Sequence, residues 1–153
     1  MEIVSYTIKR KQSDRSPIVI GVIGDIQYSG KGGTTSISRL KDYVSRCVDL
    51  NAYVLGTGDY IDMESTTGRQ KIRSANFYET VEAVLDNAAL DLTLEVYEIL
   101  KPLKGRVAGL LSGHHWHQFR HGDTSDMRLS QMLDAKFLGT SAFVRFQFDI
   151  FGN

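Results

Sequence analysis

Runs of apolar residues alternate with amphipathic segments along the chain. Three runs that are mainly apolar, Ile18 to Gly24, Ala52 to Leu55 and Arg106 to Leu111, predict strands buried on both faces of a sheet. Two further segments, Glu2 to Lys9 and Ala142 to Ile150, alternate between apolar and polar positions as half-buried strands do. The chain therefore contains at least two kinds of strand, fully covered and one-sided.

Helices are predicted where apolar residues recur at steps of three or four positions. One helix starts near Thr34 to Ser36, where hydroxyl side chains can cap it. A long helix spans Ala75 to Lys101 and stops before Pro102, and a short one spans Ser125 to Leu133. Because strands and helices alternate, the pattern predicts an α/β sheet with helices packed against it.

Composition narrows the class of protein. The 153 residues are enough for one domain with a real core, and 42% apolar with 24% charged residues is ordinary for a soluble protein. A formal net charge of zero argues against a broad surface for nucleic acid, although a small phosphate-bearing substrate or a locally held nucleic acid is compatible with it.

The single cysteine excludes an intrachain disulfide and a cysteine-based zinc site. With no signal-peptide pattern and no apolar run long enough for a membrane span, we expect a cytoplasmic protein without a membrane partner.

Candidate chemistry gathers where the three buried strands end. Each ends in a glycine followed by a residue that can bind metal: Gly24-Asp25, Gly58-Asp59 and Gly113-His114. Ligand sites in open α/β sheets lie outside the carboxyl ends of the strands, and glycine allows the backbone to turn sharply there. If the strands are neighbours, these residues meet at one edge of the sheet. Each aspartate alone could equally well satisfy backbone donors in a turn.

All four histidines lie within eight residues, at His114, His115, His117 and His121. A metal site or an acid/base site explains the two that directly follow the strand, whereas the alternative is a polar loop that happens to hold them. We interpret His117 and His121 as solvated or as residues that orient a ligand. Asp62 has a similar interpretation, since it could orient a ligand or cap a turn.

The motifs in this order resemble calcineurin-like metallophosphoesterases, in which Asp-x-His, Gly-Asp-x-x-Asp and Gly-Asn-His each follow a strand. The second motif matches in full at Gly58 to Asp62, whereas Gln27 replaces the histidine of the first and His114 the asparagine of the third. The resemblance covers Ile18 to His121. It implies a β-sandwich of mixed sheets flanked by helices, of which this chain supplies the first sheet and the start of the second.

The resemblance also implies a role for each position. Asp25 ligates one metal, with Gln27 offering a neutral amide oxygen; Asp59 bridges both metals; and His114 binds the second through its imidazole. His115 lies beside the substrate and protonates the leaving oxygen. Two divalent ions would activate a hydroxide and neutralise the phosphoryl oxygens. Oxygen-rich ligation favours manganese, with iron or zinc as alternatives.

No histidine follows His121, whereas the family completes its site with later histidines, including a Gly-His-x-His motif. We therefore expect a single phosphoesterase domain over residues 1–153 that is truncated at its C-terminus and is weakly active or inactive by itself. The leading functional hypothesis is metal-dependent hydrolysis of a phosphomonoester or phosphodiester. The alternatives are a non-catalytic binding or scaffold module of the same fold and a nuclease-like DNA-processing phosphoesterase.

Overall fold

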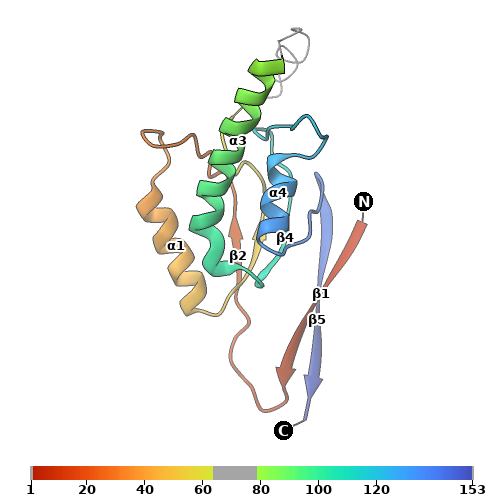
Figure 1. Cartoon of the computed structure of the whole chain (residues 1–153). Helices are drawn as coiled ribbons and strands as arrows, with labels where there is room; N and C mark the ends of the chain where they lie inside the picture. The colour runs from red at the N-terminus through yellow and green to blue at the C-terminus, as the bar shows by residue number, and fades with distance from the viewer. Residues whose placement is uncertain (1, 64–78, 153) are drawn as a thin grey trace.

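The computed structural model describes residues 2–63 and 79–152, in which strands form two separate parallel sheets. Strands β2 (Ile20–Ile23), β3 (Tyr53–Gly56) and β4 (Val107–Leu110) make a three-stranded sheet in the order β2-β3-β4. Strands β1 (Glu2–Lys11) and β5 (Ala142–Phe151) pair only with each other in the described part (Figure 1). The predicted α/β class is confirmed, and the three predicted buried strands are neighbours.

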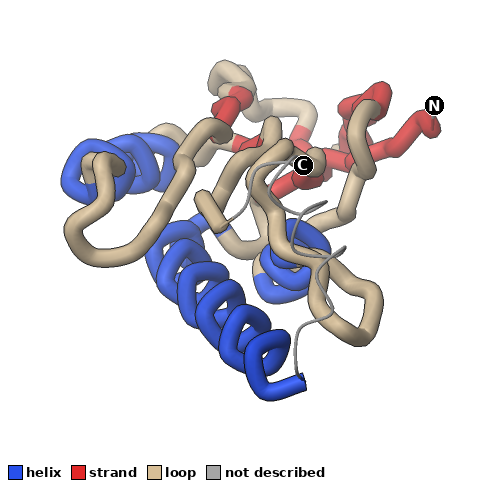
Figure 2. Tube along the Cα trace, turned by 90° about the horizontal axis from the view of Figure 1, so that it is seen from above, coloured by secondary structure: helices blue, strands red, loops and turns tan. Residues whose placement is uncertain are grey.

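The helices lie together on one side of the strands, as two perpendicular views show (Figures 1 and 2). They are α1 (Ile37–Asp49), α3 (Glu79–Leu100) with the short 3₁₀ helix η1 (Lys101–Leu103), and α4 (Ser125–Met132). The start predicted for the long helix, at residues 75–78, lies outside the described residues. In the described part of the chain, no helix combines the length and the apolar character needed to cross a membrane.

Strand β2 is less buried than its apolar sequence predicts. The side chains of Ile20 and Val22 are 44% and 58% exposed, whereas Val54 in the central strand β3 is fully buried. Among residues 2–63 and 79–152, β2 lies at the edge of its sheet and has β3 as its one strand neighbour. The prediction of burial on both faces is wrong for β2, because an apolar run does not reveal which of its faces will be covered.

The β1–β5 sheet packs on the rest of the fold through the face that carries Val4 and Ile8, both buried. The ring of Tyr6 on this face meets the ring of Tyr53 from β3 edge to face, with centroids 5.5 Å apart. The predicted alternation of β5 between covered and exposed positions holds for its first half only. Beyond Phe146 every residue of the strand is exposed.

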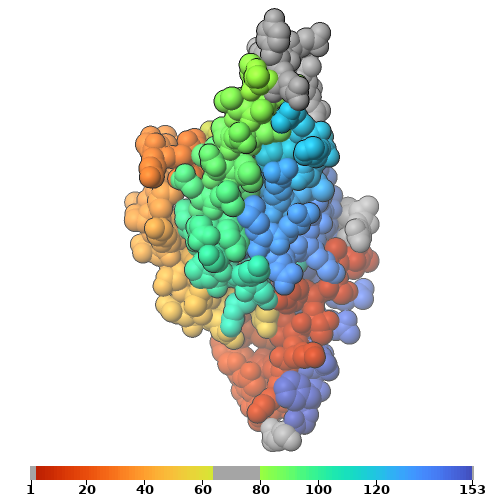
Figure 3. Space-filling view, viewed as in Figure 1, coloured from red at the N-terminus to blue at the C-terminus, as the bar shows by residue number. Residues whose placement is uncertain are grey.

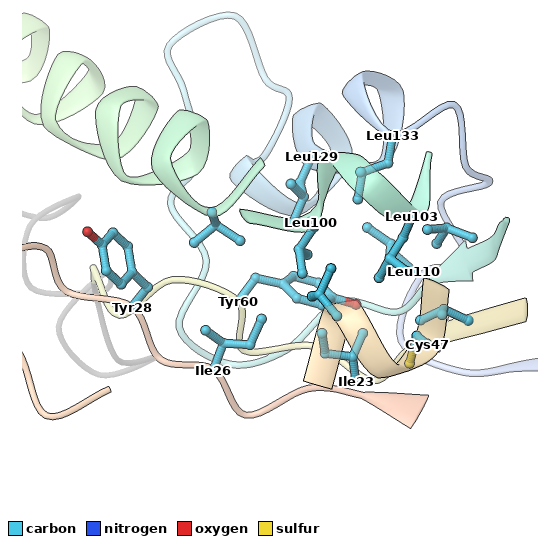
Figure 4. Packing of buried hydrophobic residues seen from close by; sticks show 14 of the residues in the cluster. Ile23, Ile26, Tyr28, Cys47, Tyr60, Leu100, Leu103, Leu110, Leu129 and Leu133 are labelled. Atoms are coloured by element: carbon cyan, nitrogen blue, oxygen red, sulfur yellow. The ribbon is translucent and has the colours of Figure 1, made fainter. Parts of the chain in front are cut away.

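Tyr60 lies at the centre of the hydrophobic core, among Ile23, Leu100 and Leu110 (Figure 4). Burial raises the pKa of its phenol, which stays protonated and can donate. The hydroxyl donates to the carbonyl of Leu111 at 3.0 Å and accepts the backbone N–H of Gly58 at 3.1 Å. One side chain therefore joins the loops that follow β3 and β4.

We expect Tyr60→Phe to lower the free energy of unfolding by about 1–3 kcal/mol, because the N–H of Gly58 and the carbonyl of Leu111 both lose a buried partner. Urea denaturation followed by circular dichroism measures the change. Tyr97→Phe is the matched control, since this half-buried hydroxyl forms no hydrogen bond among the described residues. Equal stability of the two variants would contradict the role of Tyr60.

Candidate metal centre

The loops after β2 and β3 run side by side and are strained in the same way. Asp25, Gln27 and Asp59 all adopt positive φ angles, of 53°, 46° and 56°. Residues other than glycine rarely occupy this region, and such strain persists where the surroundings fix the backbone. Here the N–H of Asp25 donates to the carbonyl of Gly58 at 3.0 Å, and that of Gln27 donates to the carbonyl of Asp59 at 2.8 Å.

The loops after β3 and β4 approach so closely that only glycine fits at the contact. A Cβ atom added to Gly58, which has a φ of 101°, would lie 2.5 Å from the Cα of Gly113. A Cβ atom on Gly113 would lie 2.1 Å from the backbone nitrogen of Asp59. The glycines that precede the candidate ligands are therefore required by the packing of one backbone on the other.

The carboxylate of Asp59 binds the backbone of the histidine loop. Its Oδ1 accepts the N–H of His115 at 3.1 Å and forms a short hydrogen bond with the N–H of His114. Its Oδ2 lies 3.9 Å from Nδ1 of His114, whose side chain is 83% exposed while that of Asp59 is 21% exposed. The structure therefore brings the second and third motifs into direct contact.

His115 and Asp62 form a second contact at this edge. Nδ1 of His115 lies 2.9 Å from Oδ1 of Asp62. An ionised carboxylate can only accept, so Nδ1–H is the donor and Nε2 is the nitrogen that can exchange a proton with a ligand. Asp62, which was predicted to orient a ligand, is thus paired with His115, the predicted proton donor.

The two residues predicted to hold the first metal also lie together, since Nε2 of Gln27 donates to Oδ1 of Asp25 at 2.8 Å. The available donors at this edge are carboxylate, amide and imidazole groups, which suit manganese, iron or zinc chemically. Among residues 2–63 and 79–152, however, no group of three or more His, Cys, Asp or Glu side chains is arranged to hold a metal ion. The donor types fit a divalent ion, and the side chains as placed do not enclose one.

His117 joins the histidine loop to α3. Its side chain is buried, and its Nε2 lies 2.7 Å from Oδ1 of Asp86 on α3, whose Oδ2 accepts from Nε of Arg120 at 3.2 Å. Although burial opposes it, these hydrogen bonds lower the pKa of Asp86. The solvated interpretation of His117 is wrong, since it ties the loop to α3, whereas His121 is exposed as predicted. Nothing in the sequence distinguishes Asp86 from the other acidic residues of its helix.

Asp126 in the first turn of α4 is a buried carboxylate that sequence reasoning missed. It is 1% exposed, and its Oδ2 accepts the N–H of Gly113 at 3.1 Å and the hydroxyl of Ser112 at 3.3 Å. Burial raises the pKa of Asp126 to about 6 against these hydrogen bonds, and the negative charge of Asp59 adds to the rise. An acidic residue in the first turn of a helix is usually explained by the helix dipole, so nothing in the sequence indicates this contact.

Comparisons with models of known protein families, with curated proteins and with solved structures found no match for this chain. The family relationship therefore stays a prediction from the three motifs and their order.

We expect Asp126→Asn to remove a pH dependence of stability. The pKa of about 6 in the folded state exceeds the ordinary value near 3.8, so the folded protein binds the extra proton between these values. Its free energy of unfolding therefore falls as pH rises through this window, by up to about 3 kcal/mol. Urea denaturation with a chelator present, at the two ends of the window, measures the difference.

Asparagine cannot ionise and can still accept from Gly113. The free energy of unfolding of the variant should therefore not decrease over this pH window. Asp134→Asn is the control, because Asp134 is exposed and asparagine tolerates its positive φ of 56°. The same fall with pH in the Asp126 variant as in the wild type would show that Asp126 is not its source.

Proposed function

We propose that this protein is a metal-dependent hydrolase of phosphate esters with the calcineurin-like metallophosphoesterase fold. One observation carries the proposal: Asp59 Oδ1 accepts the backbone N–H groups of both His114 and His115, at the ends of two adjacent parallel strands. The loop of Asp25 and Gln27 is hydrogen-bonded alongside. The residues that the motif resemblance assigns to one centre are thus neighbours at a single edge of the sheet.

In the proposed centre Asp25 and Gln27 would hold one divalent ion, Asp59 would bridge, and His114 would hold the second ion. Bound metals would supply the activated hydroxide and neutralise charge on the phosphoryl oxygens. We favour manganese because most of these donors are oxygens. The partly exposed position of Asp59 and the exposure of His114 leave both side chains accessible to a phosphate ester.

His115 would protonate the departing oxygen through Nε2. Its Nδ1 is bound by Asp62, which fixes the orientation of the ring and stabilises the charged imidazolium before the proton is transferred. After transfer the neutral imidazole keeps its Nδ1–H on Asp62, so Nε2 is the nitrogen that must be protonated again. The side chain of His115 is 28% exposed, which lets water return this proton.

A second candidate is a non-catalytic binding module of the same fold. It is favoured because, among the described residues, no three or more His, Cys, Asp or Glu side chains are arranged to hold a metal ion. Elemental analysis separates the two candidates, because a phosphoesterase should bind manganese stoichiometrically and a scaffold should bind none.

We expect a chain that also carries the C-terminal half of the fold implied by the motif resemblance to bind manganese and to hydrolyse an aryl phosphate monoester or diester when manganese is added. Asp59→Asn should lower kcat/KM at least about 100-fold, because it removes a charged ligand and weakens the contact with the histidine loop. His121→Gln is the control, since it changes an exposed histidine of the same loop. Full activity of the Asp59 variant, or no manganese binding by the wild type, would refute the proposal.

Asp62→Asn should lower kcat about 10- to 100-fold, because it removes the negative charge that stabilises the imidazolium of His115 and weakens the hydrogen bond that orients the ring. The loss should be larger for an alkyl phosphate than for a nitrophenyl phosphate, since only the poorer leaving group needs a proton. Steady-state kinetics with both substrates measure the ratio, with Asp49→Asn at an exposed position as the control. Equal losses for the two substrates would exclude His115 as the proton donor.

A further inference from the structure

The β1–β5 sheet is an unusual element because its two long strands have only each other as partners within the described chain. An isolated two-stranded sheet is marginally stable in water, and each of its outer edges presents unpaired N–H and C=O groups. The red and dark-blue atoms of this sheet form the narrow lower part of the molecule (Figure 3). This part of the surface could therefore accept a further strand.

The hydrogen bonds show which backbone groups of β5 face outward. The carbonyl of Phe151 accepts the N–H of Gln12, at 2.9 Å, on the side of β1. Successive residues of a strand direct their backbone groups to opposite sides, so the odd-numbered residues of β5 face β1. The even-numbered residues present their N–H and C=O groups at the outer edge; they are Ala142, Val144, Phe146, Phe148 and Ile150.

The two outer edges differ in charge. β1 carries the exposed lysines Lys9 and Lys11 next to Arg10, and charges of one sign on an edge strand oppose pairing with another strand. β5 contains no lysine, and its only charged residues are Arg145 and Asp149. The outer edge of β5 is therefore the one suited to accept a strand.

The sequence of β5 is complementary to itself when read in both directions from Gln147. Arg145 and Asp149 lie at equal distances from this residue and have opposite charges, and Phe143 and Phe151 lie at equal distances beyond them. In an antiparallel pair centred on Gln147, each Arg145 lies opposite Asp149 of the second copy. Each Phe143 lies opposite Phe151 in the same way.

This register also matches the direction of the backbone N–H and C=O groups at the outer edge of β5. Pairing about Gln147 places even-numbered residues opposite even-numbered ones, and these are the residues with outward-facing groups. The odd-numbered pairs then occupy the positions without hydrogen bonds, where facing side chains come closest and an ion pair is favoured. On the other face, Phe148 and Ile150, which are 46% and 63% exposed, would meet apolar side chains of the second copy.

We propose that the protein forms a two-fold symmetric dimer in which β5 pairs antiparallel with β5 of a second copy, centred on Gln147. The contact is the same surface on both molecules, as a closed two-fold interface requires. It converts two marginal two-stranded sheets into one four-stranded sheet. The proposal concerns the 153-residue chain, in which β1 is the one strand partner of β5 among the described residues, and it does not rest on catalytic activity.

Charge reversal of the 153-residue chain tests the register. Arg145→Asp and Asp149→Arg each place like charges opposite one another twice in the dimer, so each should raise the dissociation constant at least about tenfold. An equimolar mixture of the two variants brings opposite charges together at both positions and should dimerise again. The chain that carries both substitutions should also dimerise with itself. Sedimentation equilibrium over about a hundredfold range of concentration measures each constant.

A matched pair of lysine substitutions tests the centre of the contact. Gln147→Lys places two like charges opposite each other at the two-fold axis and should abolish the dimer. Thr7→Lys adds the same charge at the exposed position of β1 that pairs with Gln147, and should leave the dimer intact. Recovery in the mixture of charge-reversed variants shows that they fold. A wild type that is monomeric throughout, or a dimer unaffected by the charge reversals, would overturn the proposal.

Discussion

The carboxylate of Asp59 and the two histidine N–H groups that it accepts form the contact around which the candidate centre is built. This contact exists only because the backbones of Gly58 and Gly113 touch, at a separation that leaves no room for a side chain on either residue. Hydrogen bonds to an ionised acceptor are stronger than neutral ones, which helps to offset the strain of the positive φ at Asp59. The backbone bonds of Asp25 and Gln27 extend the same alignment to the third strand end.

A second carboxylate lies behind this contact, and the two influence each other. Asp59 and Asp126 both accept hydrogen bonds from the backbone around Gly113, and the charge of Asp59 adds to the raised pKa of Asp126. A cation held by Asp59 would weaken this repulsion and favour the ionised form of Asp126. The ionised form in turn binds the N–H of Gly113 more strongly. Metal binding and the order of the histidine loop would therefore support each other.

The sequence predicts the part of this arrangement that depends on local pattern. The apolar runs locate β3 and β4, the short helix predicted from Ser125 is found there as α4, and the glycine before each candidate ligand marks the edge of the sheet. What it does not reveal depends on distant partners. Val22 in the edge strand β2 is exposed, whereas the other edge strand, β4, is buried at every position, and Asp126 is buried where it contacts Gly113. Periodicity records which faces are apolar, and it does not record which face another element will cover.

The candidate centre and the β5 edge are linked through a short segment that follows α4. The backbone of Leu110 exchanges hydrogen bonds with Lys136 and Leu138, and the N–H of Ser112 donates to Gly139 at 2.7 Å. The chain then enters β5, whose exposed second half is the part farthest along the strand from Gly139. Association through β5 would stabilise the folded chain by mass action. Coupling to the centre would further require two arrangements of the segment before Ala142, since a ligand changes a distant site only through an element with two states.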